Sequence, residues 1–413
     1  MNDWKTKQIK QLGRVVTGKT PPKVRPDYFG GNELFVSPKD FDWNGGYVER
    51  TQTTITEKAL CAFRNQVIPR NAVLFTCISF GFGKIAIASR QLLTNQQINS
   101  VIANENHHFR FVYYLLRVYT PVIYSFNSGI DTPIVPKSVF EKIEVKCPEL
   151  ELQRKIAAIL TAYDDLIEAN KRRIALLERM AEEIYREWFV RMRFPGYQNT
   201  KFVKGLPEGW EIIQFGQIAN MIMGQSPKSE FYNDSGQGLP FHQGVGTYGD
   251  RFPRNITFCT ADGRKAKKGD ILFSVRAPVG RLNIANCELI IGRGIAAIRQ
   301  KEGKNSYLYY LLRTMFANED IIGNGSIFNS VGKDELSRFV VLRHPDHLTA
   351  RFEKIALPID QQIEALIHSN SVLTKTRDLL LPRLISGKIS VADLDIQFPP
   401  SMCEEDKDLG RVS

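Results

Sequence analysis

The 413-residue chain carries a formal net charge of +11, with 43% hydrophobic and 24% charged residues. This length allows two or more hydrophobic cores, and the positive charge favours an anionic partner, most commonly nucleic acid. The sequence has no apolar run long enough to cross a bilayer, no signal peptide pattern and no paired cysteine spacing. We therefore expect a cytoplasmic protein with reduced thiols, no zinc site and no membrane partner.

The sequence contains a long internal repeat. Residues 111–145 align without a gap with residues 307–341, and both copies contain the block Tyr-Tyr-Leu-Leu-Arg. A period of about 200 residues indicates two whole domains of one kind and is too long for a solenoid unit. The loops after Gly18 and Gly224 differ between the copies, as expected of two binding units with different targets. Ordinary drift after duplication is the alternative.

Each copy opens with short apolar runs broken by Gly, Pro, Asn and Asp, a pattern typical of strands. A helical segment follows in both copies, around residues 111–119 and 307–316. The sequence therefore predicts an α+β protein with two similar domains, residues 1–147 and 194–345.

Each domain is followed by a segment with the spacing of a coiled-coil helix, residues 148–193 and residues 346–390. Neither helix can bury its apolar stripe alone. We therefore predict that the two pack antiparallel with a globular domain at either end, in pseudo-two-fold symmetry. Pro358 and Pro382 are expected to kink or shorten the second helix, and a tail follows at residues 391–413. The predicted seam consists of Leu152, Ile156, Ile159, Tyr163, Leu166, Asn170, Ile174, Leu177, Ile184, Phe352, Ile355, Ile359, Leu366, Leu373 and Leu380.

Asparagine interrupts this apolar pattern at Asn170, and Asn370 lies beside the second seam. A seam asparagine can set the register of a coiled coil at some cost in stability. The alternative, which we favour from the sequence, is that each is solvated where the seam loosens.

Residues 13–20 match the phosphate-binding pattern GxxxxGK[ST]. A P-loop needs a helix that starts at its lysine, but here Pro21 and Pro22 follow at once, and the residue before a proline avoids helical geometry. The second copy has Gln225 in place of the lysine. We predict instead that Lys19 contacts a DNA phosphate.

The sequence contains no convincing catalytic constellation. We find no methyltransferase motif, no assignable nuclease cluster and no metal-like spacing of histidines, so we expect a non-catalytic chain with no bound metal. Two alternatives to a DNA-binding function stay open at this point. One is a P-loop NTPase that uses Gly13–Thr20, and the other is a coiled-coil scaffold that binds only protein.

The long helical segments carry motifs of a known family. The run Pro148-x4-Gln153-x2-Ile156, followed by Asp164-Asp165-x-Ile167-Glu and Trp188-Phe189-Val190, resembles the central conserved region of type I restriction–modification specificity subunits. Leu206-Pro207-x-Gly209-Trp210 resembles the start of that family's second domain. Arg377-Asp378-x-Leu380-Leu381-Pro382 with Ser386-Gly387 resembles its distal conserved region. The resemblance covers nearly the whole chain, although Leu348–Pro358 departs from the pattern of the central region.

This resemblance implies that each globular domain is a target-recognition domain that reads one half of a split sequence in double-stranded DNA. The paired helices would set the gap between the halves and dock two methyltransferase subunits, which motor-nuclease subunits then join. It further implies that S-adenosylmethionine, ATP and Mg²⁺ belong to those partners and that this chain holds no cofactor.

Contacts to DNA need cations for phosphates and hydrogen-bonding groups for base edges. We predict them among polar residues in the Gly- and Pro-punctuated loops, where Lys84 corresponds to Arg281 and Lys19 to Gln225. The candidates are Lys19, Thr20, Lys23, Arg25, Lys39, Asp40, Lys84, Gln96, Gln97, Asn99, Gln225, Ser226, Lys228, His242, Gln243, Tyr248, Arg276, Arg281 and Arg293.

Overall fold

The computed structural model describes residues 4–42, 45–78, 83–127, 134–316 and 330–403. The chain divides into two compact units. Unit 1 comprises Met1–Lys171 and His368–Ser413, and unit 2 comprises Arg172–Ile367. Among the described residues, no helix is both long and apolar enough to span a membrane.

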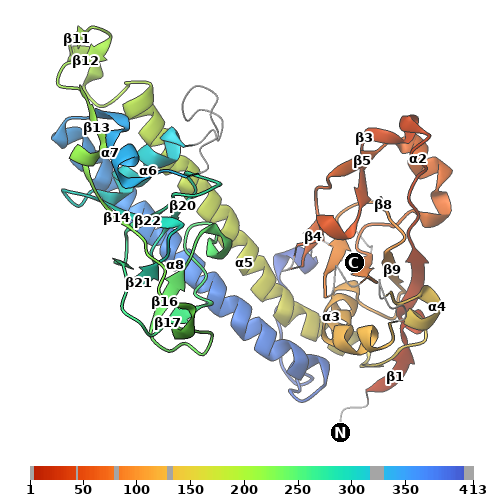
Figure 1. The fold of residues 1–413 in the computed structure, drawn as a ribbon. Helices are drawn as coiled ribbons and strands as arrows, with labels where there is room; N and C mark the ends of the chain where they lie inside the picture. The colour runs from red at the N-terminus through yellow and green to blue at the C-terminus, as the bar shows by residue number, and fades with distance from the viewer. Residues whose placement is uncertain (1–3, 43–44, 79–82, 128–133, 317–329, 404–413) are drawn as a thin grey trace. The chain divides into compact units, whose positions relative to one another are not determined.

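Unit 1 is built around a five-stranded sheet in the order β2-β9-β6-β7-β4 and a three-stranded sheet in the order β5-β3-β8 (Figure 1). Alternate residues of β6 pack into two different hydrophobic cores, because successive side chains of a strand point to opposite faces of the sheet. Phe75 packs towards α3, whereas Leu74 packs towards β3 and β8. The elements are β1 (Lys5–Gln8), α1 (Ile9–Leu12), β2 (Gly13–Thr17), β3 (Phe29–Val36), β4 (Tyr47–Val48), β5 (Thr53–Ile55), α2 (Glu57–Ala62), β6 (Val73–Thr76), β7 (Ile85–Ala88), β8 (Leu92–Thr94), β9 (Ile98–Ala103), α3 (Phe109–Ser125), α4 (Lys137–Phe140) and β10 (Glu144–Cys147).

Unit 2 contains a four-stranded sheet in the order β14-β22-β19-β20 and a five-stranded sheet in the order β15-β17-β16-β21-β18. Phe273 and Leu272 on β19 divide between two cores in the same way. The elements are β11 (Phe202–Val203), β12 (Leu206–Pro207), β13 (Glu211–Gln214), β14 (Ala219–Met223), β15 (Tyr232–Asn233), β16 (Leu239–His242), β17 (Phe258–Cys259), β18 (Lys265–Ala266), β19 (Ile271–Ser274), β20 (Leu282–Ile284), β21 (Leu289–Ile291), β22 (Ile295–Gln300), α6 (Asn305–Met315), α7 (Lys333–Arg338) and β23 (Val340–Arg343).

The two units share one topology, which confirms the predicted repeat and the α+β class. In unit 1, β2 pairs with β9 and β3 runs parallel to β8; in unit 2, β14 pairs with β22 and β16 runs parallel to β21. Single hydrogen bonds also correspond. The amide of Gly18 donates to Ile98 O at 3.2 Å, and the amide of Gly224 donates to Ile295 O at 2.9 Å.

The long helices α5 (Leu150–Tyr185) and α8 (Asp346–Ile385) pair within each unit (Figure 1). In unit 1, Asp164 of α5 accepts a hydrogen bond from Arg377 of α8, and six residues further along α5, Asn170 meets Asn370. In unit 2, the rings of Tyr185 and Phe352 lie 5.6 Å apart. Rising numbers on α5 meet falling numbers on α8, so the packing is antiparallel, as predicted.

One prediction about α8 is wrong. The helix is not shortened at its prolines, because it runs unbroken from Asp346 to Ile385 through Pro358 and Pro382, while a kink at either proline stays a prediction. Both prolines lie at exposed positions. Water can therefore satisfy the backbone carbonyl that each ring leaves without its partner.

The buried seam is also wider than predicted and locally shifted by one residue. Leu166 is 48% exposed, whereas its neighbour Ile167 is 8% exposed. On α8, Ile363 is fully buried, and the predicted Leu366 and Leu373 are only half-buried. The physical reason is that α5 and α8 pack on the globular cores as well as on each other, which widens the buried arc beyond a coiled-coil seam.

The interpretation of Asn170 and Asn370 as solvated residues is wrong as well. Asn170 is buried and its Nδ2 donates to Asn370 Oδ1 at 2.8 Å, while Asn370 Nδ2 donates to Ile167 O at 3.3 Å. The repeat places Leu366 and Ile174 at the corresponding positions of unit 2. A polar pair present in only one of two equivalent places is suited to fixing the register of the helices.

Matching polar contacts join each domain helix to the long helices. Tyr114 of α3 donates to Asp164 Oδ2 at 2.5 Å, and Tyr310 of α6 donates to Asp360 Oδ1 at 3.2 Å. In unit 2 a further residue joins this contact: Arg251, whose side chain is 1% exposed, pairs with Asp360 and with Glu178. This arginine comes from a loop of the globular domain, so it ties that domain to both long helices.

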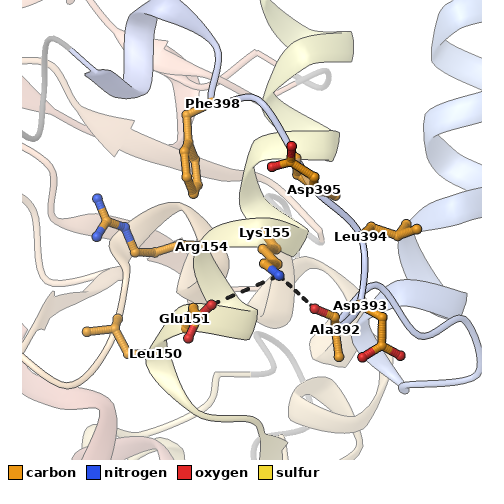
Figure 2. Close-up of a pocket in the computed structure, with 10 residues that line it drawn as sticks. Leu150, Glu151, Arg154, Lys155, Ala392, Asp393, Leu394, Asp395 and Phe398 are labelled. Carbon is orange, nitrogen blue, oxygen red and sulfur yellow. Dashed lines mark hydrogen bonds and ion pairs between the residues drawn. The ribbon is translucent and has the colours of Figure 1, made fainter.

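The C-terminal tail folds back over the start of α5 in unit 1. Figure 2 shows Lys155, whose Nζ donates to Ala392 O at 2.6 Å, and Phe398, whose ring lies 5.5 Å from the guanidinium of Arg154. Further along, Ser401 donates to Asp165 Oδ2 at 2.7 Å, and Met402 is fully buried. The tail is therefore part of the unit 1 core up to the last described residues.

His344 is expected to make unit 2 sensitive to acid. Its ring is 5% exposed, Nδ1 is bonded to the Tyr307 hydroxyl at 2.6 Å, and no described residue pairs with Nε2. Burial lowers the pKa of His344 to about 3, from 6.5. Between these values the unfolded chain binds the proton and the folded unit does not, so stability falls as pH falls through this window.

The expected loss is about 1.4 kcal/mol per pH unit below the unfolded pKa, or about 2 kcal/mol at pH 5. Thermal unfolding of the wild type and of His344→Gln between pH 7.5 and 5 measures it. The variant is expected to unfold at a lower temperature at pH 7.5 but with a weaker pH dependence. The exposed His347→Gln serves as the control, and an equal pH dependence in all three proteins would refute the prediction.

Candidate nucleic-acid interface

The turns after β2 and β14 are equivalent and closely packed. A Cβ added to Gly18 would lie 2.2 Å from the carbonyl oxygen of Asn95, and one added to Gly224 would lie 2.1 Å from that of Gly292. Only glycine allows this approach of two backbone segments. Each turn is therefore held against the connection between two strands, β8 and β9 in unit 1 and β21 and β22 in unit 2, and the residues after the glycine are placed at one edge of the sheet.

In unit 1 this edge carries a hydroxyl–amide pair. Thr20 Oγ1 donates to Gln96 Oε1 at 2.7 Å, and both residues are exposed. Lys19 is exposed beside them, with its Nζ 5.8 Å from the centre of the Phe63 ring. Holding the amide oxygen directs the amide nitrogen of Gln96 away as a hydrogen-bond donor, which is the type of group that reads base edges.

Unit 2 carries a similar pair with a different glutamine. Ser226, which corresponds to Thr20, donates from Oγ to Gln243 Oε1 at 2.7 Å and accepts from the Arg293 amide at 3.2 Å. Gln243 follows β16 and lies against Gly292, where an added Cβ would come within 2.6 Å of Oε1. Gln243 and Arg293 are exposed at one edge together with Gln225.

Four of the candidates are poorly placed to contact DNA. Asn99 is buried and accepts from Thr17 Oγ1 at 2.6 Å, which links β2 to β9. His242 is fully buried between Thr247 and Asn255, and burial lowers its pKa. The Tyr248 hydroxyl is buried, and Asp40 accepts from the backbone of Ser37 and Gln52. Polarity alone does not separate such residues from DNA contacts, because strand packing and turn capping also use polar side chains.

The remaining candidates lie outside these two clusters or are partly neutralised. Arg25 forms a bidentate pair with Asp27, and Lys228 lies 3.8 Å from Glu230. The Thr76 amide donates to Lys84 O at 3.3 Å and the Ser274 amide to Arg281 O at 2.9 Å, which confirms that Lys84 and Arg281 correspond. Contacts with DNA by Lys23, Lys39, Gln97 and Arg276 stay predictions.

The P-loop pattern at Gly13–Thr20 does not form a phosphate-binding loop. Its first five residues form strand β2, and none of Gly18, Lys19 and Thr20 lies in a helix. A P-loop requires the helix N-terminus at the lysine. Within the described ranges, no group of three or more His, Cys, Asp or Glu side chains is arranged to hold a metal ion.

Sequence reasoning missed two residues that support the unit 2 cluster and its domain. Gly292 makes room for Gln243, and Arg251 is the buried anchor to the long helices. The sequence gives only a weak signal for Gly292, because a glycine next to a strand is common. It gives no signal for Arg251, because the carboxylates that pair with it are 73 and 109 residues away in the sequence.

Two α+β domains of one topology, each with a polar edge and each packed on paired helices, define a two-site recognition protein. A model of the type I restriction modification DNA specificity domain matches residues 1–179 and 207–341. The chain therefore belongs to this family, as a type I restriction–modification specificity subunit with two recognition domains.

Individual relatives agree over nearly the whole length. The type I restriction enzyme MjaIX specificity subunit of Methanocaldococcus jannaschii is 27% identical over 413 residues, which is 95% of each chain. The MjaVIII specificity subunit of the same organism is 22% identical over 95% of this chain and 94% of its own. The type I S subunit of M. genitalium has the same fold, with a TM-score of 0.61, 16% identity and coverage of 93% of this chain and 96% of that one.

Proposed function

We propose that each recognition domain reads one half of a split sequence in double-stranded DNA. The observation that carries this proposal is the hydroxyl–glutamine pair at the same edge of both domains, Thr20 with Gln96 and Ser226 with Gln243. The hydroxyl occupies the same position in both domains and holds the glutamine side chain. The glutamines come from different elements, because Gln96 lies between β8 and β9 and Gln243 follows β16. Glutamine pairs bidentately with adenine in the major groove, so each half of the target is expected to contain an adenine read in this way.

The long helices set the gap between the two halves and dock two methyltransferase subunits. Each unit offers an apolar position outside the helix seam to support this role. Val372 in unit 1 and Leu176 in unit 2 occupy equivalent places in the repeat and are 48% and 62% exposed. Leu379 and Met180, also exposed, continue each stripe at helical spacing. Exposed apolar stripes on helices are typical docking surfaces for partner helices.

The chain itself is non-catalytic in this proposal. The methyl donor, ATP and Mg²⁺ bind to the methyltransferase and motor-nuclease subunits that join the complex. The specificity subunit contributes sequence recognition, and its net charge of +11 contributes non-specific attraction to DNA.

Methylation-site sequencing of cells that carry this chain with its methyltransferase subunit tests the proposal. The expected result is one motif of two short specified halves separated by a fixed number of unspecified base pairs. A continuous motif would contradict the two-reader model. Absence of any DNA binding by the assembled complex would favour a scaffold that binds only protein.

A further inference from the structure

Four arginines converge on an open hollow in the first recognition domain, away from the Thr20–Gln96 pair. They are Arg14 on β2, Arg64 and Arg70 from the segment between α2 and β6, and Arg90 just before β8. Val67, Pro69 and Gln91 complete the lining, and no described aspartate or glutamate lines the hollow. None of these residues was among the predicted DNA contacts, because they are scattered over residues 14–91.

Three of the four arginines, Arg14, Arg64 and Arg90, have no carboxylate partner among the described residues. In the described part of the chain, the side chains of Arg14 and Arg64 form no hydrogen bond or ion pair, and both residues are exposed. Arg90 donates from Nη2 to the carbonyl oxygen of Asn32 at 2.6 Å, which leaves its charge uncompensated. Guanidinium groups that lie together without carboxylate partners, here those of Arg14, Arg64 and Arg90, repel one another and favour a bound anion.

The second recognition domain shows that the repeat does not require this charge. The bridge between Ile68 and Leu92 corresponds to the pairing of Ala266 with Leu289, which aligns the two regions. Around the equivalent place, Lys265 lies 3.4 Å from Asp262 and 3.7 Å from Glu288. Asp262 and Glu288 stand where the first domain has Arg64 and Gln91. Two carboxylates therefore lie beside Lys265 at this place in the second domain, whereas no described carboxylate lines the hollow of the first.

The hollow and the Thr20–Gln96 pair lie at opposite ends of the same strands. Arg14 lies at the start of β2, and Thr20 follows the end of that strand. In the same way, Arg90 precedes β8 and Gln96 follows its end. The five residue steps from Gln91 to Gln96, of which Leu92–Thr94 form strand β8, span at most about 17 Å. This equals the rise of about five base pairs of DNA at ~3.4 Å each.

We infer that the Arg14–Arg64–Arg70–Arg90 hollow binds phosphates of the DNA backbone, within about five base pairs of the base that Gln96 reads. The inference rests on the proposed function and adds a backbone clamp specific to the first domain. Guanidinium groups bind phosphate oxygens bidentately, and such contacts raise affinity without selecting sequence. A duplex therefore gains electrostatic affinity on the first-domain side, where no carboxylate of the hollow opposes it.

The test uses the complex of the full chain with its methyltransferase subunit and two DNA duplexes of about 40 base pairs. One duplex carries the motif found by methylation-site sequencing, and the other carries a scrambled sequence. Arg14→Gln with Arg64→Gln is compared with a matched control, Lys265→Gln with Lys268→Gln, which removes the same charge from the second domain. In the wild type Lys268 pairs with Glu364 at 2.7 Å. Affinity is measured between about 50 and 200 mM salt.

Loss of two phosphate contacts should lower the slope of log affinity against log salt by about 2 and the affinity at 100 mM salt by about 60-fold. Both duplexes should be affected equally, the methylation motif should stay the same, and the control pair should keep the wild-type slope. An unchanged slope in the arginine variant would overturn the inference. If that variant instead lost association with the motor-nuclease subunits, an acidic protein would be the ligand. A wild-type complex that does not prefer the motif duplex would contradict the proposed function, whatever the arginine variant does.

Discussion

Arg251→Met is expected to destabilise unit 2 by about 3–5 kcal/mol, because it leaves two mostly buried carboxylates without their common partner. Arg251 pairs with Asp360 and Glu178, whose side chains are only 15% and 23% exposed, and its guanidinium also lies 4.7 Å from the centre of the Tyr309 ring. For a unit of this size the loss corresponds to roughly 10 °C in unfolding temperature. Thermal unfolding of the full chain measures it.

Two further variants separate the charge effect from simple truncation. Combining Arg251→Met with Asp360→Asn should recover part of the loss, because a neutral amide no longer needs a buried counter-charge and can still accept from Tyr310. Arg254→Met, an exposed neighbour in the same loop, should be close to wild type. A loss below about 1 kcal/mol for Arg251→Met would show that the triad is not an anchor.

Gln243→Ala is expected to relax recognition of one half of the target while leaving the other half unchanged. A bidentate amide–adenine contact contributes about 1–3 kcal/mol of discrimination. In the variant, the ratio of the methylation rate on the original target to that on a target with the adenine replaced should therefore fall about 10- to 100-fold. Relative methylation rates on a set of duplexes, each altered at one position, measure this selectivity. The altered duplexes that the variant methylates faster, relative to the unaltered duplex, than the wild type does should all carry their change in the half read by the second domain.

Gly292→Ala provides an independent route to the same result. Its methyl group would lie 2.6 Å from Gln243 Oε1, so the glutamine must move from its bond with Ser226. Gln237→Ala, an exposed glutamine in the same domain but outside this cluster, is the control. Unaltered selectivity in both Gln243→Ala and Gly292→Ala would exclude Gln243 as a reader of bases.

The sequence predicts most of the architecture because repeats and helix periodicity are local or self-similar signals. The block Tyr-Tyr-Leu-Leu-Arg identified both copies, and it corresponds to the buried faces of α3 and α6. Periodicity could not tell Leu166 from Ile167 at the seam. That choice depends on how α5 packs against both a globular core and a second helix, which are contacts between residues far apart in the sequence.

The candidate site was predictable only in part, for a related reason. Polar residues in loops include both ligand contacts and internal bonds, and the sequence does not distinguish Gln96 on the surface from Asn99 three residues later in a strand. The residues of the arginine hollow, in contrast, were not singled out by the sequence at all. Arg14 lies in a strand and Arg64 in a short turn, so neither stands out until the fold brings them together.

Exchange of the first recognition domain tests the central claim most directly. Residues 1–147 are replaced with the equivalent domain of a relative, such as a specificity subunit with a different target, and the methylation sites of the hybrid are sequenced. Because the two domains are separate copies with their own polar edges, base contacts should not pass between them. We predict that one half of the motif changes while the other half and the gap length stay the same. A hybrid that folds and methylates but alters both halves together would contradict the account of two independent readers.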